Sequence, residues 1–340
     1  HIIYFHNGIF RDDAQILFWE YIDFAKEHGI KLVLDLDDWP DWGEQHLLYQ
    51  FNRENHIAER ILVNVYKVDY ITTTTEYFKR KLEKVTGKNN IYVFRNCIDI
   101  QSPQFEINKK PSERLRLGIS GGISHGKDYN QIYSILRKLP KQYLDKIQLV
   151  LVGWNTNGTI SFWPEVENKF TINKTICSKE YRDYLNECKT NEDSEPDISN
   201  EIYRRITVKK IYKQSTKTEG NYGLTYNNFD ILLAPLTSSD FNNFKSELKF
   251  VEAGFTGTGI IYSETGPYRN VVNDHPELKD MTIGVNLTTG VGGWVKAIKW
   301  AVDNKEKMME MNKKFSDFII EEYDIKKENK KRYEFLKSIL

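Results

Sequence analysis

The chain has 340 residues, enough for two domains of ordinary size, and 40% of them are hydrophobic and 13% aromatic, as in a folded protein. Lys+Arg and Asp+Glu number 48 each, so the net charge gives no argument for nucleic acid or an anionic membrane as a partner. The three cysteines are widely spaced and odd in number, which predicts a reducing, cytoplasmic compartment and no disulfide framework.

The first hundred residues alternate between apolar, β-branched runs and amphipathic stretches. Gly29 and Gly87 close two of the amphipathic stretches, as glycine commonly does at helix ends. Alternating strands and helices predict a parallel sheet with helices on both faces. The chain begins without Met and directly on a core-like strand, so we expect an incomplete N-terminal domain. Strands are predicted at 1–5, 31–38, 68–74 and 90–96, and helices at 14–28, 45–67 and 76–87.

A polar stretch with two prolines, 99–113, interrupts this pattern, and we interpret it as an interdomain linker. The segment 155–206 is poorer in apolar residues and includes an acidic, turn-rich excursion at 189–201. Elsewhere the alternation restarts, with strands predicted at 115–120, 146–153, 229–236 and 257–264, and helices at 128–138, 245–255, 296–304 and 305–340. The predicted fold class is α/β, with two Rossmann-like domains at 1–100 and 114–319 and a linker at 101–113.

Parallel sheets bind ligands at the carboxyl ends of their strands, and the stretch GISGGISHGKD (118–128) follows such a strand. Glycines at 118, 121, 122 and 126 permit positive φ and a close approach of the backbone to a ligand. The start of the next helix favours an anion such as phosphate, and His125 and Lys127 add donors. The spacing is neither Walker A nor G-x-G-x-x-G, and an ordinary glycine loop stays the alternative.

The stretch FKSELKFVEAG (244–254) carries charged residues among apolar ones. If 245–255 is helical, Lys245, Lys249 and Glu252 form a stripe beside the face that packs on the sheet. The simplest interpretation is an i, i+3 ion pair between Lys249 and Glu252 on a solvated face. However, two lysines one turn apart repel, and a cation at a helix N-terminus is disfavoured unless an anion is bound. This favours a ligand stripe.

The stretch LVLDLDDWPD (32–41) places Asp35, Asp37 and Asp38 after an apolar strand. Asp-x-Asp after a strand is also typical of HAD phosphohydrolases, in which Asp35 would be the nucleophile and Asp37 the acid/base near magnesium. That pattern expects Thr or Val where Trp39 stands, and the strand at 229–236 does not end in the closing acidic pair. The HAD interpretation stays an alternative, as does an N-capping acidic loop.

Taken in order, these stretches resemble the GT-B glycosyltransferases, and in particular the GT4-like group of retaining, nucleotide-sugar-dependent enzymes. The resemblance covers most of the chain, and its most specific part is the run of about forty residues from DILLAPL to TGPY. The other parts are LVLDLDDWPD, VDYITTTTEYFKRKL (68–82), VFRNCID (93–99) and LGISGGISHGKD (117–128). Arg95 stands where the family usually has proline.

The resemblance implies two Rossmann-like domains facing a cleft, with C-terminal helices (about 320–340) that cross back to the first domain. It implies a hexosyltransferase of polysaccharide biosynthesis, without metal or other cofactor, which moves a sugar from a nucleotide-sugar, by default a UDP-sugar, with retention. The acceptor would be a glycan, a lipid-linked molecule or a protein. No apolar run approaches the ~20 residues of a membrane span, while peripheral association with a membrane stays open.

On the donor side, the resemblance implies that Glu252 accepts hydrogen bonds from the ribose hydroxyls. Lys249 and His125 would neutralise the diphosphate leaving group, a catalytic role that can replace a metal ion. Phe244 stands where the family has the first glutamate of its E-x7-E motif, so the residues that would bind the donor sugar are not assigned. The other donor-binding residues implied are Gly121, Gly122, Lys127, Asn243, Lys245 and Ser246.

On the acceptor side, the resemblance implies that the acidic cluster lines the cleft and that Asp37 or Asp38 orients or deprotonates the acceptor hydroxyl. A third hypothesis is a catalytically degenerate GT-B protein that binds a glycan or partner. Phe244 and the missing upstream strands leave room for it.

Overall fold

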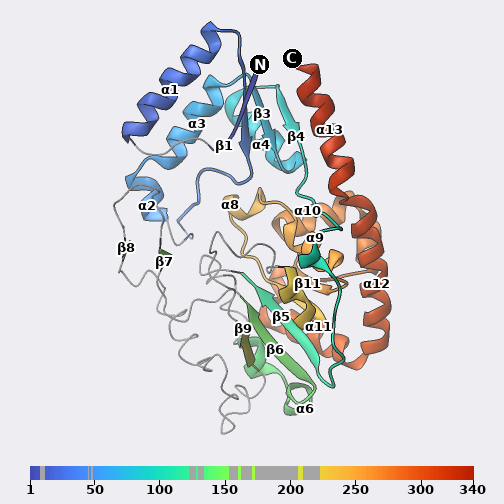
Figure 1. The fold of residues 1–340 in the computed structure, drawn as a ribbon. Helices are drawn as coiled ribbons and strands as arrows, with labels where there is room; N and C mark the ends of the chain where they lie inside the picture. The colour runs from blue at the N-terminus through green and yellow to red at the C-terminus, as the bar shows by residue number, and fades with distance from the viewer. Residues whose placement is uncertain are drawn as a thin grey trace.

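Two parallel sheets form the framework of the protein (Figure 1). The first has four strands in the order β1-β2-β3-β4, and the second has six in the order β12-β11-β10-β5-β6-β9. All neighbouring strands in both sheets are parallel, which confirms the predicted α/β class. The computed structural model describes residues 1–7, 12–44, 46, 49–121, 128, 134–152, 160–161, 171–172, 206–209 and 223–340.

The first sheet and its helices come from the first hundred residues. Leu32, Val33 and Leu34 of β2 are all at most 1% exposed, as expected for a parallel strand covered on both faces. Thr75 caps α4 by accepting a hydrogen bond from a backbone N–H of the first turn, and Gly87 ends it with a φ of 70°. The elements are β1 Ile2–His6, α1 Asp12–Glu27, β2 Lys31–Leu36, α2 Tyr49–Glu54, α3 Ile57–Lys67, β3 Tyr70–Thr73, α4 Glu76–Thr86 and β4 Ile91–Val93.

The second sheet has the strand order of a dinucleotide-binding Rossmann fold, because its strands numbered along the chain lie in the spatial order 3-2-1-4-5-6. The order reverses between β5 and β10, and such a reversal opens a crevice for ligands at the carboxyl ends of the strands. The strands are β5 Leu115–Ser120, β6 Ile147–Val152, β9 Ile206–Lys209, β10 Ile231–Ala234, β11 Gly259–Ser263 and β12 Ile283–Val285.

Helices and short 3-10 turns complete this half. The segment predicted as a linker contains η1 Pro103–Phe105, and η4 Gly223–Asn228 precedes β10. Two short antiparallel strands, β7 Ile160–Ser161 and β8 Thr171–Ile172, form a separate pair. The helices are α6 Lys141–Leu144, α8 Asp240–Asn243, α9 Leu248–Phe255, α10 Gly266–Asp274, α11 Gly290–Asp303, α12 Lys305–Glu322 and α13 Ile325–Ser338, with η5 Pro276–Asp280 and η6 Leu287–Thr289.

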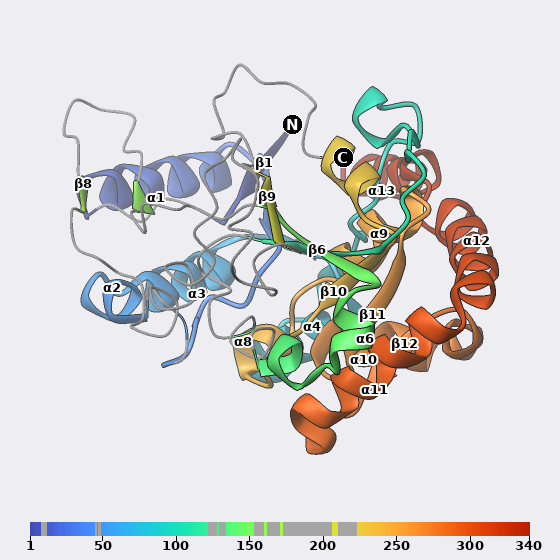
Figure 2. The same cartoon turned by 90° about the horizontal axis from the view of Figure 1, so that it is seen from below.

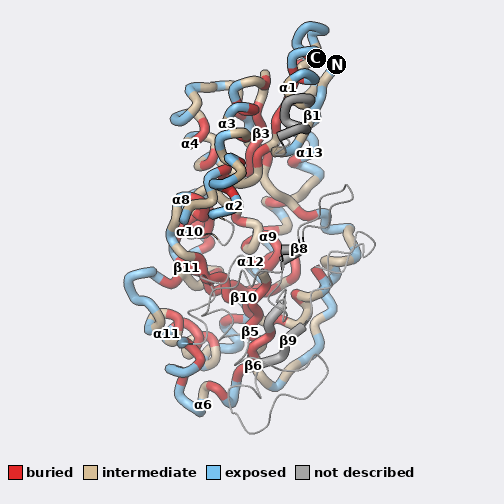
Figure 3. The backbone as a smooth tube through the Cα atoms, turned by 90° about the vertical axis from the view of Figure 1, so that its left-hand side faces the viewer, coloured by how far each residue is buried: buried red, intermediate tan, exposed pale blue. Residues whose placement is uncertain are grey.

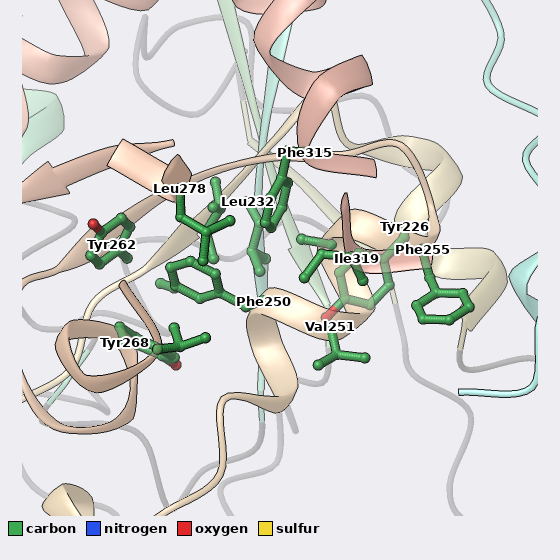
Figure 4. Close-up of a cluster of buried hydrophobic side chains, with 14 of the residues drawn as sticks. Tyr226, Leu232, Phe250, Val251, Phe255, Tyr262, Tyr268, Leu278, Phe315 and Ile319 are labelled. Carbon is green, nitrogen blue, oxygen red and sulfur yellow. The ribbon is translucent and has the colours of Figure 1, made fainter. Parts of the chain in front are cut away.

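An aromatic cluster fixes α9 against the second sheet (Figure 4). The ring of Phe250 lies 4.9 Å from Tyr262 of β11 and 5.7 Å from Phe315 of α12, both edge-to-face, and 5.6 Å from Tyr268. Such pairs stabilise beyond the burial of their area. The helices α9 and α12 lie side by side in two perpendicular views (Figures 1 and 2). The position of α9 is therefore set by its apolar side.

The C-terminal helix α13 packs on the first sheet. Phe335 contacts the rings of Tyr92 and Phe94 at 4.3 and 5.5 Å and is buried together with Val33. The backbone N–H of Arg95 donates to Glu328 at 2.9 Å at the start of this helix. Figure 3 shows buried segments along strands such as β3, β5 and β10, while the start of α6 is exposed. The chain thus crosses from the second sheet back to the first.

Three local expectations differ from the structure. The helix expected over 45–67 is two helices, α2 and α3, which part at His56, a residue with a φ of 51°. The helix expected over 245–255 begins only at Leu248, since α8 ends at Asn243 and the residues between are not helical. Gly118 is not part of a ligand loop, because it lies within β5 against the ring of buried Phe229.

We expect Gly118→Ala to destabilise the protein by about 1–3 kcal/mol, the usual cost of overpacking a core. An added Cβ would lie 2.1 Å from the Phe229 ring, which cannot move without disturbing its neighbours. Gly292→Ala on α11 is the matched control, because no atom lies within 4 Å of its Cβ position, and alanine there should be neutral or stabilising. Urea unfolding measures both, and equal stabilities would contradict the packing argument.

Candidate functional site

The candidate site lies at the carboxyl ends of β5 and β10, where the strand order of the second sheet reverses. A buried carboxylate joins the loops that follow these two strands. Oδ1 of Asp128 accepts from the backbone N–H and the hydroxyl of Thr237, at 2.7 and 2.8 Å. The side-chain amide of Asn242 donates to the Thr237 carbonyl at 3.0 Å. The loop after β10 is therefore fixed before it reaches the lysines.

Lys245 lies between the two halves of the molecule. Its ammonium group lies over the Phe241 ring at 4.5 Å. Burial lowers the pKa of Lys245, while Asp38 and Asp128 oppose that shift. Burial likewise raises the pKa of Asp38, and Lys245 is the main opposing charge. This lysine therefore interacts electrostatically with an acid that follows a strand of the first sheet and with one from the second.

Lys249 and Glu252 form the ion pair that their spacing allows, with Nζ 2.9 Å from Oε2. The pair is not on a solvated face: the Glu252 side chain is only 5% exposed, and its Oε2 also accepts from the Tyr226 hydroxyl at 2.5 Å. Tyr226 comes from η4 and is fully buried. A buried carboxylate is tolerated only when it is paired. Lys249 and Tyr226 therefore stabilise the Glu252 carboxylate at the edge of the sheet where a ligand is expected.

The residues before α9 connect the two halves. The side-chain amide of Asn96, which follows β4, donates to Oγ of Ser246 at 2.8 Å. Asn243 is half-buried at the end of α8. Glu247 is buried and accepts from the Tyr323 hydroxyl at 2.9 Å, and its burial raises the pKa of its carboxyl group. Ser246 and Glu247 are thus tied to segments far away in the sequence.

The acidic cluster meets a histidine at the end of β1. Nε2 of His6 lies 3.1 Å from Oδ1 of Asp37, and the Asn7 side chain donates to the same oxygen at 3.2 Å. Asp35 instead accepts a hydrogen bond from Thr72 within the sheet. Asp37, but not Asp35, therefore belongs to a polar group at the carboxyl edge of the first sheet.

Sequence reasoning did not select His6, Tyr226 or Glu247. His6 could have been found, because it ends a strand next to the one that precedes the acids, and carboxyl ends of parallel strands meet at one edge. Tyr226 and Glu247 carried no local signal, since their partners come from other elements.

Of the predicted residues, Gly121 follows the end of β5, while Gly122, His125 and Lys127 lie outside the described residues. In the described ranges there is no group of three or more His, Cys, Asp or Glu side chains that could hold a metal ion. No helix in those ranges is long and apolar enough to cross a membrane.

No protein-family model matches the chain, and no curated protein matches it. Among solved structures, Anabaena HepE in complex with UDP and glucose matches with a TM-score of 0.65 at 12% identity, over 99% of this chain and 78% of HepE. A trehalose-6-phosphate synthase, described in a study of glycosyltransfer with retention, matches with a TM-score of 0.60 at 12% identity, over 100% of this chain and 74% of that one.

TarM matches with a TM-score of 0.57 at 11% identity, over 92% of this chain. The chain spans only 57% of the length of TarM. A mutant of the S. aureus protein is also known in complex with fondaparinux, α-GlcNAc-glycerol and UDP. At these identities the matches establish the fold, which is the GT-B fold of these glycosyltransferases.

We expect Tyr226→Phe to lower the free energy of unfolding by about 1.5–3 kcal/mol, the contribution of a hydrogen bond to a charged group. The variant removes a donor from the buried Glu252 carboxylate and leaves the ring in place. Tyr143→Phe is the control: its hydroxyl donates to Asp303 at the surface, so its loss should change stability little. Chemical unfolding measures the stability of both variants. An equal loss of stability in the two would contradict the argument that burial makes the Tyr226 hydrogen bond the stronger one.

Proposed function

We propose that this protein is a glycosyltransferase that moves a sugar from a nucleotide-sugar donor, by preference a UDP-sugar, to a glycan, lipid-linked or protein acceptor. The observation that carries the proposal is the Lys249–Glu252 ion pair, with Lys245 close before it in the chain and interacting electrostatically with Asp38 and Asp128. It brings phosphate-compatible cations and a buried carboxylate to the point where a Rossmann sheet binds nucleotides. The UDP present in the HepE and TarM complexes supports the choice of donor.

On the donor side, Lys249 has two alternative partners. Without donor it pairs with Glu252, and with donor its ammonium group turns to the diphosphate while Glu252 accepts from the ribose hydroxyls. As the bond between sugar and phosphate breaks, negative charge grows on the leaving diphosphate, and a preorganised cation stabilises that charge. Lys245 adds a second cation from the residues just before α9, and Asn243, Ser246 and the backbone at Gly121 complete the polar surface.

On the acceptor side, the His6–Asp37 pair orients the acceptor hydroxyl. A histidine held by a carboxylate can take up the proton that the hydroxyl loses, and Asp38 interacts electrostatically with Lys245. We propose retention of configuration, which the trehalose-6-phosphate synthase study describes for its own enzyme. No metal is required for these steps, because lysines supply the positive charge.

The remaining assignments follow from this function. We propose a donor-binding domain at 114–319 and an acceptor-side domain at 1–100 that is completed by the C-terminal helix, with 101–113 as linker. We also propose that the protein is cytoplasmic and acts in polysaccharide biosynthesis, which fits a nucleotide-sugar donor. The HAD alternative has less support, since Asp35 bonds to Thr72 within the sheet.

A second candidate function is a degenerate GT-B protein that binds ligand without turnover. Phe244, at the position of the first family glutamate, lies 5.8 Å from Trp39 and 6.4 Å from Phe78, with Lys81 over its ring. The position is thereby part of an aromatic contact between the two halves, and no carboxylate there can contact the sugar. This observation favours weaker binding of the donor sugar, as expected for the degenerate protein.

We expect Lys249→Ala to lower kcat for sugar transfer by roughly 10²–10³, the effect of removing a donor that stabilises transition-state charge. KM for the donor should change less, since the charge on the diphosphate grows only as the bond breaks. Steady-state kinetics with a panel of nucleotide-sugars measure both. Lys296→Ala, exposed on α11, is the control. Equal losses in kcat and in binding would indicate simple anchoring, and no turnover by the wild type with any donor would favour the degenerate protein.

We expect Glu252→Ala to weaken UDP binding by about 1–3 kcal/mol, because the ribose hydroxyls lose their acceptor and Lys249 loses its partner. Calorimetric titration with UDP and GDP measures the change. Glu264→Ala, an exposed glutamate after β11, is the control. Unchanged affinity for both nucleotides would exclude the ribose assignment.

A further inference from the structure

A second groove lies at the opposite end of the second sheet from the candidate site. Its volume is about 700 Å³, in the range of small-molecule sites. The linker at 107–112 and the helix α12 form its walls, and Arg116 and Asp230, at the amino ends of β5 and β10, form its floor. Figure 1 shows the linker running beside α12. The groove is therefore separate from the crevice at the carboxyl ends.

The groove is positively charged. Five cationic side chains line it, against two acidic ones, Asp230 and Asp317. The charge of Asp230 is neutralised by Arg116, whose guanidinium group donates to both carboxylate oxygens, at 2.7 and 3.2 Å. Within the described residues, neither Lys110 nor Lys313 has an acidic group within 4.0 Å. Exposed lysines on facing walls repel one another, and an anion between them relieves the repulsion.

A third lysine is built into the wall. The side chain of Lys109 is half-buried, and its amino group donates to the Gly257 carbonyl at 3.0 Å and to Oγ1 of Thr258 at 2.6 Å. An ammonium group has three donors, so one remains for the groove that this residue lines. Burial lowers the pKa of Lys109 to about 7, with nearby Asp230 opposing the shift. An anion at this point would recover the charge interaction that burial takes away.

Apolar side chains that are partly open to solvent also line the groove, next to the polar Ser112, Asn312 and Ser316. Ile107 on the linker and Met309 on α12 are 53% and 63% exposed, and Leu115 and Ile320 also line the groove. A ligand that matches this surface has an anionic head and an apolar body.

We propose that this groove binds a phosphate monoester with an apolar body, its phosphate held by Lys109, Lys110 and Lys313 and its body lying on Ile107 and Met309. The ligand bridges the linker and α12, which packs on α9. Its source is either a soluble ester or the head of a membrane lipid, and both have the same chemistry. The site does not depend on the proposed transferase function.

Octyl phosphate is the probe, with inorganic phosphate and octanol as its two separate halves. We expect calorimetry on the full chain to show binding of octyl phosphate that is stronger than that of either half, and that saturating UDP leaves unchanged. The double variant K110E/K313E should weaken it about tenfold or more, because attraction becomes repulsion at both positions. Lys314→Glu, the exposed neighbour on α12 outside the groove, is the matched control and should bind as the wild type does.

Two further arms separate the possible sources. Sedimentation with phosphatidic acid vesicles that is lost in K110E/K313E would identify a lipid head, and octyl phosphate binding without vesicle binding would identify a soluble ester. Lys109→Gln removes the ammonium group of the third lysine and should also weaken the binding of octyl phosphate. The proposal is overturned if octyl phosphate does not bind, if K110E/K313E and Lys314→Glu bind it alike, or if UDP displaces it, which would place the probe in the donor crevice.

Discussion

The ammonium group of Lys245, a half-buried side chain, interacts electrostatically with acids of both halves of the molecule. It is desolvated, which is unfavourable for a cation, and its charge is compensated by Asp38 from the loop after β2 and by Asp128 after β5. Without either acid, less negative charge would offset the desolvation of the lysine. The loops after β2 and β5 therefore both help to accommodate Lys245.

The contacts around Lys245 show how this alignment is maintained. Phe244 packs on Trp39, Ser246 binds Asn96, and Glu247 binds Tyr323. Each residue of this short run thus contacts a segment remote from it in sequence. Because the run is held along its length, it does not continue the helix α9, and its polar groups point to different partners instead of lying on one helical stripe. A loop fixed by its surroundings can place charges more accurately than a mobile one.

The charges at the two ends of the second sheet are compensated in different ways. At the carboxyl ends, acids and lysines compensate one another, and in the proposed function a charged ligand would exchange partners with groups such as Lys249 and Glu252. At the amino ends, Arg116 and Asp230 compensate each other fully, while the lysines above them are in excess. The first arrangement suits a reaction step in which negative charge develops on the ligand. The second suits the binding of a ligand that is already negatively charged.

The sequence by itself determined the elements and their class. Buried apolar runs such as β2, helix ends at glycines, and the break at the linker are local patterns, and local patterns are set by backbone sterics and burial. The family resemblance predicts where the donor site lies, because the residues that it implies are grouped in short motifs. Only the tertiary structure decided the strand order that creates the switch point, the break before α9, and the partners Asp37–His6 and Glu252–Tyr226. These depend on contacts between residues far apart in the chain, where the energy of packing and of buried hydrogen bonds, rather than local periodicity, selects one arrangement.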